Sequence, residues 1–296
     1  MAAEDFPTRR LCGTMPATIK QLELNPGLRR AQRDLEDATN ERLATRTVVR
    51  RGVLEVSTVV HVVHNTNEQN ISDDQIQSQI DVLNQDFRAT NSDLDRVPDV
   101  WRPLATDTQL EFRLADVTRT HTDREYFSDE DDVILKSTSA GGHDVIDPDS
   151  NLNIWVCNLD PYLGYAYLPG TIQAERDGVV IGYRWFGTEG SATEPYNLGR
   201  TATHEIGHHL NLYHIWGGGD LPICGDTDFV EDTPNQLEPN YERPNFPHIT
   251  CDNGPYGDMF MNYMDYVYDD SMFMFTTQQV VRMRTALAES RPNLGQ

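Results

Sequence analysis

The sequence predicts an α+β fold, with a sheet and two helices in one lobe and mostly loops with a final helix in the other. Three observations lead to this prediction. Several short segments are apolar or alternate in polarity, as sheet strands do. Two stretches combine an apolar face with helix-capping residues. Residues 215–275 are rich in Gly, Pro, Asn and Asp, which favours loops.

The first 50 residues differ from the rest of the chain. The stretch "NPGLRRAQRDLEDATNERLATR" is charged and helix-prone, and its apolar stripe is too thin to bury a core. The basic pair Arg50–Arg51 follows it, and a β-branched strand is then expected at about 53–63. We therefore expect an N-terminal pro-segment over 1–50 and a separate domain over 51–296.

The helices of the main domain begin at recognisable caps. Ser72 and Gln75 have the spacing of a capping box, and one apolar face follows them, formed by Ile76, Ile80, Leu83 and Phe87. A central helix is expected over about 198–210, and a last helix near Thr276, with Gln279 in the second capping box. Further strands are expected in "LEFRLADV", "LNIWVCNL" and "GVVIGY".

The charge balance excludes some partners. The chain has 296 residues, and 47 acidic against 24 basic side chains give a formal net charge of −23. Such a chain repels nucleic acid and anionic membranes, and it attracts cations such as calcium and basic peptides. No apolar run approaches the roughly 18 residues of a membrane span. The start "MAAEDFPTRR" has no apolar signal region, so export would need a signal already removed or another route.

The stretch "HEIGHHLNLYH", residues 204–214, carries four histidines. On a helix His204 and His208 share one face, whereas His209 points away from it. On a straight helix His214 would lie roughly 9 Å beyond His208, which is too far for the ~2.1 Å bonds of one zinc ion. The chain must therefore turn between them, and Asn211 is the residue that best accepts a left-handed turn.

Glu205 directly follows the first of these histidines. In H-E-x-x-H sites this glutamate does not bind the metal but handles the proton of a metal-bound water. His204, His208 and His214 with a water in the fourth position would form a catalytic rather than a structural zinc site.

Downstream lies "NYMDY", in the region where the extended zinc motif is followed by a methionine turn. Together with "HEIGHHLNLYHIWG", "CGDTDFVEDTPNQ" and "LNIWVCNL", it makes the chain resemble the pappalysin family of metzincin metallopeptidases, and within it the ulilysin-like microbial members. The resemblance covers about residues 50–290. One departure is Asn211, where the wider metzincin pattern has Gly.

This resemblance implies a twisted, mostly parallel sheet with a backing helix and the zinc helix, over an irregular lower lobe that ends in a helix. The upper lobe would reach to about residue 211 and the lower lobe would span 212–296. Met264 would lie beneath the zinc without binding it. The Tyr266 hydroxyl would stabilise the transition-state oxyanion.

The loop "CGDTDFVEDTP" holds several acids. By spacing alone an exposed acidic loop is the favoured interpretation, because the glycine and terminal glutamate of an EF-hand are missing. The resemblance instead implies calcium bound by Asp228, Thr233 and a main-chain carbonyl near Val230, with Asp226 as a weaker candidate.

The four cysteines, Cys12, Cys157, Cys224 and Cys251, allow three pairings. Cys224–Cys251 is favoured because both residues lie in loop-rich sequence, and the resemblance implies the same bridge. A disulfide would indicate an oxidising, extracellular compartment. The Cys12 thiolate could bind zinc and block catalysis, as in the cysteine switch of metzincin zymogens. The alternatives are a free cysteine or a bridge to Cys157.

In the family that the chain resembles, an aspartate at the position of Asp269 selects arginine for the residue after the scissile bond. A carboxylate can hold an arginine fork through two hydrogen bonds. The alternative is a solvated loop acid, like Asp270. Such an enzyme could release its own segment at Val49–Arg50 or Arg50–Arg51.

The function predicted from these residues is that of a secreted, monomeric zinc endopeptidase made as a zymogen, with protein or peptide substrates and a preference for Arg or Lys after the cut. Two alternatives remain at this point: a catalytically weak zinc-containing adhesin or binding protein, and a zinc hydrolase with other substrates. The remaining histidines have no ligand spacing and are expected to be structural or exposed: His61, His64, His121, His143 and His248.

Overall fold

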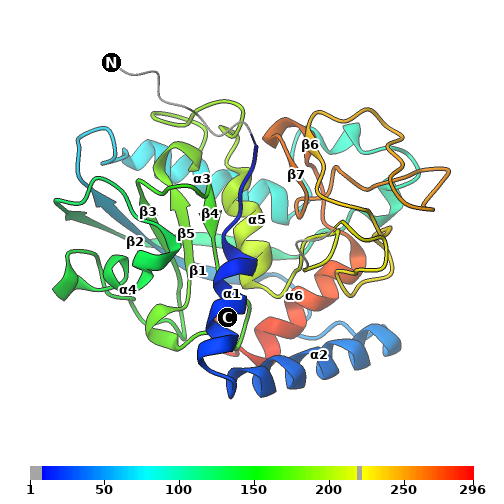
Figure 1. Cartoon of the computed structure of the whole chain (residues 1–296), viewed down its shortest axis with the longest axis horizontal. Helices are drawn as coiled ribbons and strands as arrows, with labels where there is room; N and C mark the ends of the chain where they lie inside the picture. The colour runs from blue at the N-terminus through cyan, green and yellow to red at the C-terminus, as the bar shows by residue number, and fades with distance from the viewer. Residues whose placement is uncertain (1–8, 219–221) are drawn as a thin grey trace.

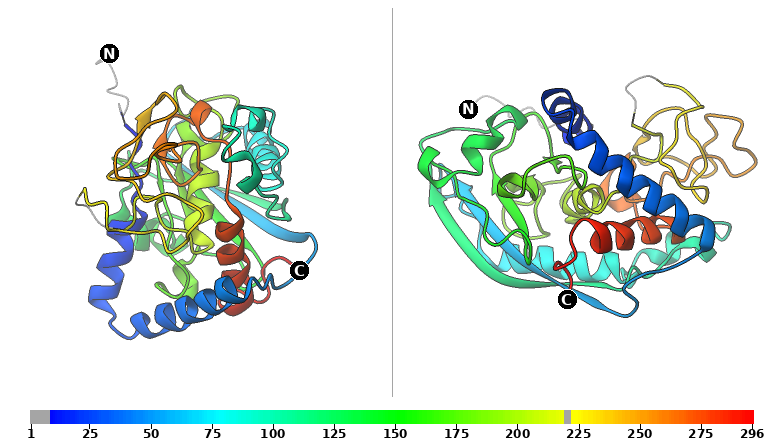
Figure 2. Two further views of the ribbon diagram at one scale, coloured as in Figure 1. Left: turned by 90° about the vertical axis from the view of Figure 1, so that its right-hand side faces the viewer. Right: turned by 90° about the horizontal axis from the view of Figure 1, so that it is seen from below.

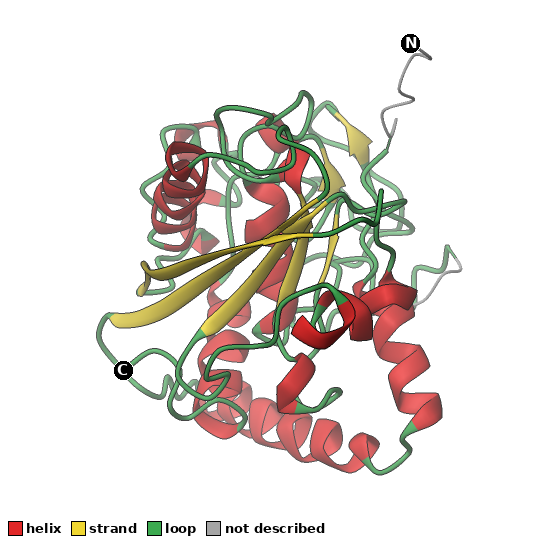
Figure 3. Ribbon diagram, turned by 90° about the vertical axis from the view of Figure 1, so that its left-hand side faces the viewer, coloured by secondary structure: helices red, strands yellow, loops and turns green. Residues whose placement is uncertain are grey.

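A five-stranded sheet in the order β2-β1-β3-β5-β4 forms the upper lobe of the computed structural model, which describes residues 9–218 and 222–296. β1, β2, β3 and β5 are parallel, and only β4 runs antiparallel to its neighbour β5. The strands twist across the sheet (Figure 3). Their bounds are β1 Leu54–His64, β2 Leu110–His121, β3 Leu152–Cys157, β4 Gly164–Tyr165 and β5 Val179–Gly182.

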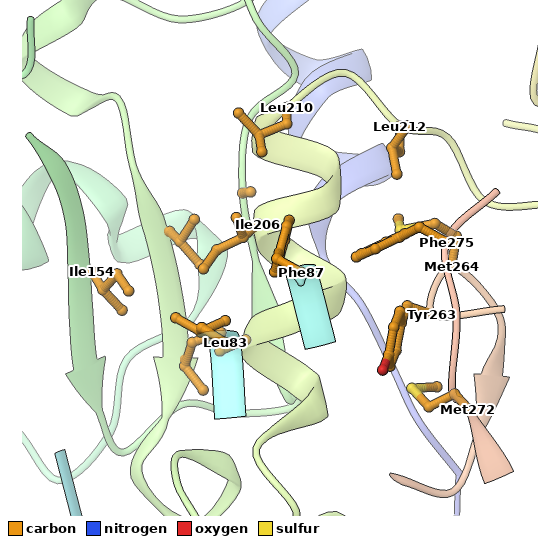
Figure 4. Packing of buried hydrophobic residues seen from close by; sticks show 14 of the residues in the cluster. Leu83, Phe87, Ile154, Ile206, Leu210, Leu212, Tyr263, Met264, Met272 and Phe275 are labelled. Atoms are coloured by element: carbon orange, nitrogen blue, oxygen red, sulfur yellow. The ribbon is translucent and has the colours of Figure 1, made fainter. Parts of the chain in front are cut away.

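Two helices, α3 (Asp73–Phe87) and α5 (Arg200–His209), pack against the sheet and against each other. Ile206 of α5 meets Leu83 and Phe87 of α3 in the core between these elements (Figure 4). The predicted apolar face of α3 is confirmed, since Ile76, Ile80, Leu83 and Phe87 are all buried.

The predicted capping box of α3 is half right. The Ser72 hydroxyl accepts a hydrogen bond from the Gln75 backbone N–H, as expected. The Gln75 side chain does not return to Ser72, because it donates to the carbonyl oxygens of Tyr183 and Phe186 in a distant loop. At the last helix, α6 (Thr277–Glu289), both halves of the predicted box between Thr276 and Gln279 are present.

The lower lobe consists mostly of loops, as the sequence predicts. It contains a two-stranded parallel pair, β6 (Tyr241–Glu242) and β7 (Tyr266–Val267), and it ends in α6 (Figure 1). The predicted disulfide Cys224–Cys251 is present, with an S–S distance of 2.09 Å. The disulfide links the loop that follows the 204–214 motif to the segment around Cys251.

The N-terminal segment forms two helices, α1 (Thr14–Leu24) and α2 (Leu28–Thr45). α1 contacts β4, and α2 lies along α6 on the underside of the molecule (Figure 2). The sequence indicated a helix over the charged stretch that became α2, whereas α1 was not singled out. A short helix, α4 (Asp132–Leu135), completes the α-helices of the described residues, which also contain several 3-10 turns. Among those residues, no helix combines the length and apolarity that a membrane crossing needs.

Candidate active site

Three histidine side chains converge at the end of α5. The Nε2 atom of His208 lies 3.1 Å from Nε2 of His204 and 3.0 Å from Nε2 of His214. α5 ends at His209, and Asn211 has a φ of 73°, in the left-handed region. The predicted turn at Asn211 is therefore confirmed, and it brings His214 back to the two histidines of the helix.

Hydrogen bonds on the far sides of the rings orient two of these histidines. The Nδ1 atoms of His204 and His208 each lie 2.7 Å from a backbone carbonyl oxygen, of Tyr263 and Leu212 respectively. A ring that donates from Nδ1 presents the lone pair of Nε2, the arrangement typical of metal-binding histidines. Burial lowers the pKa of His208 to about 4 and holds the pKa values of His204 and His214 well below the usual range. All three rings are therefore neutral, which metal binding requires.

The Cys12 thiol is the fourth member of this cluster. Its Sγ and one nitrogen from each of the three histidines all lie within 4.8 Å of one another, and all four residues are buried. Three imidazole nitrogens and one thiolate fit the tetrahedral preference and the ligand types of zinc. Cys12 and Cys157 are both free, so the alternative bridge between them does not form.

Main-chain pairing holds Cys12 in place. Leu163 donates to the carbonyl oxygen of Leu11 over 2.9 Å, and Gly13 donates to the carbonyl oxygen of Gly164 over 3.0 Å. The segment therefore runs parallel to β4 as an added strand. Gly13 is required for this close approach, because a Cβ there would come within 2.9 Å of the Tyr162 ring.

Glu205 lies beside the cluster and is buried. Its Oε2 accepts a hydrogen bond of 2.8 Å from the Thr14 hydroxyl and lies 3.3 Å from the Cys12 Sγ. Burial raises the pKa of Glu205 to about 7, although the Thr14 hydrogen bond opposes this. The Thr14 hydroxyl also accepts from the Ala166 backbone N–H over 2.8 Å. Sequence reasoning missed Thr14, which lies two residues after Cys12 in "RLCGT".

Met264 packs closely against α5 at Gly207. It is fully buried, and a Cβ at Gly207 would come within 2.5 Å of its Sδ. Gly207 is thus a second residue that sequence reasoning missed: it lets the helix approach the methionine closely. The sequence signal was the glycine within "HEIGHH".

The Tyr266 ring flanks the histidines, with its centroid 4.9 Å from that of His214 and 5.7 Å from that of His204. Trp216 stacks on His214, with ring centroids 4.2 Å apart and planes 7° apart, and its ring centroid also lies 4.6 Å from that of Tyr266. Burial holds the pKa of Tyr266 well above its usual value, so its hydroxyl stays protonated and able to donate.

Asp269 is not a solvated loop acid, since it is fully buried. Its Oδ1 lies 2.5 Å from the guanidinium of Arg10, a segment residue that sequence reasoning did not single out. Its Oδ2 accepts from the backbone N–H groups of Leu198 (2.9 Å) and Arg200 (3.3 Å) at the start of α5. Arg10 also donates to the Thr201 hydroxyl over 3.1 Å.

A cavity of about 310 Å³ lies next to the cluster, and residues of the lower lobe and of the N-terminal segment line it. His214, Trp216 and Tyr266 form one wall, and Cys12 and Met15 of the segment form another. The segment thus lies between the two lobes, because it pairs with β4 of the upper lobe and contacts Asp269 and the cavity residues of the lower lobe.

The predicted calcium residues lie in one loop of the lower lobe, where Asp228, Val230 and Thr233 are buried and Asp226 is half-buried. Asp228 accepts hydrogen bonds from the Thr233 hydroxyl (2.8 Å) and from the Val230 backbone N–H (3.3 Å). Burial raises the pKa of Asp228 to about 7. The Asp228 carboxylate and the Thr233 hydroxyl offer oxygen atoms of the kind that calcium prefers, whereas the backbone group in contact with Asp228 is the N–H of Val230. Asp226 lies instead close to Gly217, where an added Cβ would meet its carboxyl group.

The other histidines lie outside the cluster. His61 is fully buried in β1, between Thr118 and Asn153, whereas His121 and His143 are not buried. His209 points away from the cluster, as predicted, and contacts Asp177 and Arg291.

Comparisons with known proteins agree with this geometry. The family profile described as "Pregnancy-associated plasma protein-A" matches residues 143–288. An extracellular metalloprotease of Colletotrichum graminicola is 31% identical over 96% of this chain and 92% of its own length. Extracellular metalloprotease 1 of Coccidioides posadasii is 32% identical, over 80% of this chain and 78% of its own length.

Solved structures extend the similarity. A promirolysin mutant from Tannerella forsythia shares 40% identity, with a TM-score of 0.87, over 97% of this chain and all of that chain. Mature mirolysin in complex with a cleaved peptide shares 45% identity, with a TM-score of 0.78, over 83% of this chain and 99% of that chain. The predicted metzincin-type fold is confirmed, and the chain has the fold of a zymogen. It is a metalloendopeptidase, and it belongs to the pregnancy-associated plasma protein-A, or pappalysin, family of metzincins.

Proposed function

We propose that His204, His208 and His214 bind a catalytic zinc ion and that Glu205 is the general base of peptide hydrolysis. One observation carries this proposal: three Nε2 atoms converge on one point, with a buried carboxylate beside them. The zinc, when bound, acts as a Lewis acid and lowers the pKa of water to near 7.

The side chains around the zinc site have separate roles in the reaction. Glu205 takes a proton from the attacking water at its carboxylate and returns it to the departing amine. Tyr266 donates its hydroxyl hydrogen to the oxyanion. Met264 and Gly207 keep the floor beneath the histidines closely packed.

The preferred substrates carry Arg or Lys directly after the scissile bond. Asp269 forms the acidic end of the pocket for that residue, and the position of Arg10 against it supports this assignment. Only Oδ1 of Asp269 is available to a substrate, because Oδ2 is bound by the start of α5. Arg should be preferred over Lys, since a guanidinium can also reach the Thr201 hydroxyl, as Arg10 does.

Residues 1–50 are the pro-segment, and Cys12 is the ligand that blocks the zinc until this segment is removed. The guanidinium of Arg50 donates to the carbonyl oxygens of Leu287, Leu294 and Gly295, whereas Arg51 is exposed. The Arg50–Arg51 bond is therefore the favoured cut of the two candidates, because the exposed Arg51 side chain can enter a pocket. Mature mirolysin matches 83% of this chain and promirolysin 97%, which is consistent with loss of a segment of this size.

Calcium bound at Asp228, Thr233 and the Val230 carbonyl, with Asp226 as a further candidate, stabilises the lower lobe. The enzyme is secreted and acts as a monomer. The extracellular relatives and the disulfide support secretion. The site supports a monomer, because one chain supplies all of its residues.

The test uses purified full-length chain, processed to its mature form and assayed on casein. Glu205→Ala should retain zinc, measured by atomic absorption, and lose at least about 10²–10⁴-fold in activity, because the proton transfer is lost. His214→Ala should lose zinc. A Glu205→Ala variant with wild-type proteolysis would contradict the mechanism, and a zinc-loaded wild type without proteolysis would favour the binding-protein alternative.

A further inference from the structure

The second pro-segment helix is bound to the catalytic domain through one carboxylate. Glu36 of α2 accepts from both terminal nitrogens of Arg282 of α6, at 3.0 and 2.6 Å. The Asn211 side-chain amide donates to the same carboxylate over 3.2 Å. Three donors thus surround one carboxylate group, in the fork geometry that arginine uses for carboxylate recognition.

The catalytic domain builds this site without help from the pro-segment. The Arg282 side chain is fully buried when α2 is in place, and its third nitrogen, Nε, donates to the Asn211 carbonyl oxygen over 3.0 Å. The rings of Tyr213 and Phe229 flank the guanidinium, with centroids 5.4 and 5.8 Å from it. Since none of these four residues belongs to residues 1–50, the donors stay fixed when the segment is cut.

The site also adjoins the metal cluster. Asn211 is the left-handed residue between His208 and His214, and the next carbonyl, of Leu212, accepts from the His208 Nδ1. Arg282 therefore holds the turn that places His214. Glu36 binds to the two residues of this turn contact, Arg282 and Asn211.

The cleft and this site hold different parts of the pro-segment. Arg10, Cys12 and Thr14 lie in the cleft, whereas α2 lies along α6 on the underside (Figure 2). Beside the Glu36 site, Gln32 donates to the Tyr213 hydroxyl over 3.0 Å. A single cut at Arg50–Arg51 breaks none of these contacts.

We propose that Arg282 and Asn211 form a carboxylate-binding site that keeps α2 bound through Glu36 after the Arg50–Arg51 bond is cut. The first cleavage then gives a nicked, noncovalent complex, and full activity requires dissociation or further cutting of the segment. This inference rests on the proposed zymogen function, but the site itself can be tested without any cleavage.

The first experiment tests the site in uncleaved full-length chain carrying Glu205→Ala, which prevents proteolysis. Glu36→Ala removes the methylene and carboxylate that acetate can replace. Thermal unfolding is measured in sodium acetate and in sodium chloride of equal concentration. We expect a lower Tm in the Glu36→Ala chain, and acetate, but not chloride, should restore about 2 °C or more of it. The parent and Asp37→Ala, at the exposed neighbouring acid of the same helix, should show no difference between the two salts. Equal responses of the Glu36→Ala chain to acetate and chloride would overturn the carboxylate site.

The second experiment tests retention with Glu36→Gln, which keeps the shape and removes the charge. Glu205→Ala chains with and without this change are cut by a trace of mature enzyme and followed by native mass spectrometry and gel filtration. The nicked parent should keep its N-terminal fragment, and the Glu36→Gln chain should lose it about tenfold faster, because a charge-assisted pair is lost. Equal loss from both chains would refute the proposal. A failure of the enzyme to cut at all would count against the proposed function instead, and the acetate result would still stand.

Discussion

The guanidinium of Arg10 lies 2.5 Å from the buried carboxylate of Asp269, while Cys12, two residues later, joins the histidine cluster. One short stretch of the pro-segment therefore fills the proposed specificity pocket and the proposed metal site together. Since the stretch runs parallel to β4, its pairing with the edge of the sheet also blocks the backbone groups there. The proposed latency and the proposed specificity thus depend on the same few side chains.

Replacing Asp269 should change specificity more than stability. Asp269→Asn retains one oxygen for the N–H groups of Leu198 and Arg200, but it removes the charge that faces arginine. The ratio of kcat/KM for Arg over Leu after the cut should fall about 10- to 100-fold, as expected for loss of a hydrogen bond between charged groups. Mass spectrometry of digested peptide mixtures measures it. Undiminished enrichment of Arg after the cut would show that another group selects the residue.

Thr14 should contribute to latency independently of Cys12. Thr14→Val keeps the shape of the side chain but leaves the Glu205 carboxylate and the Ala166 N–H without their hydroxyl partner. We expect full-length Thr14→Val to process itself several-fold faster than the parent, and Cys12→Ala to do so to a greater extent. The rate of self-processing is measured by sodium dodecyl sulfate gel electrophoresis of samples taken over time. Thr18→Val, at another buried threonine of α1, serves as the control. Equal rates for Thr14→Val and the parent would limit the role of Thr14 to packing.

The sequence predicted those parts of the site that local periodicity determines. The spacing of His204 and His208 on one helix face, and the need for a turn before His214, follow from helix geometry alone, and Asn211 adopts the expected left-handed conformation. The N-terminal caps of α3 and α6 could be predicted for the same reason. The Gln75 side chain, however, donates to carbonyl oxygens in a distant loop, which no local pattern encodes.

The contacts that depend on distant chain segments were not predictable in this way. Arg10 and Thr14 reach partners 152 to 259 positions away, and the sequence around them resembles any charged terminal segment. β4 has only two residues, too few for an alternating pattern, yet it is the edge on which the pro-segment pairs. A bridge between Cys12 and Cys157 stayed open from sequence because the fold, and not the spacing, keeps the two thiols apart.

Removal of calcium should destabilise the lower lobe. A calcium-selective chelator should lower the Tm of the zinc-loaded chain by about 5 °C, assuming that the site was filled at about 100 times its Kd. Asp228→Asn should have the lower Tm without chelator and show no further shift. The Tm of Asp226→Asn should respond to the chelator as the wild-type Tm does if Asp226 only packs beside Gly217. Calorimetry with parallel zinc analysis makes the measurement, and a chelator that leaves the wild-type Tm unchanged would remove the calcium assignment.

His61 should make the fold sensitive to acid. Its Nε2–H donates to Asn153 Oδ1 and its Nδ1 accepts from the Thr118 hydroxyl, both over 2.8 Å, so these contacts fit the neutral ring. Burial lowers the pKa of His61 to about 4, below its usual value of 6.5. Between these two pH values the unfolded chain binds a proton that the folded chain does not, so stability falls as pH decreases from 6.5 to 4. This one residue should cost about 2 kcal/mol of unfolding free energy between pH 7.5 and pH 5. His61→Gln should therefore be less stable at pH 7.5 but lose about 2 kcal/mol less than the wild type on acidification. Denaturant titrations at both pH values test this, and parallel losses in wild type and His61→Gln would place the acid sensitivity elsewhere.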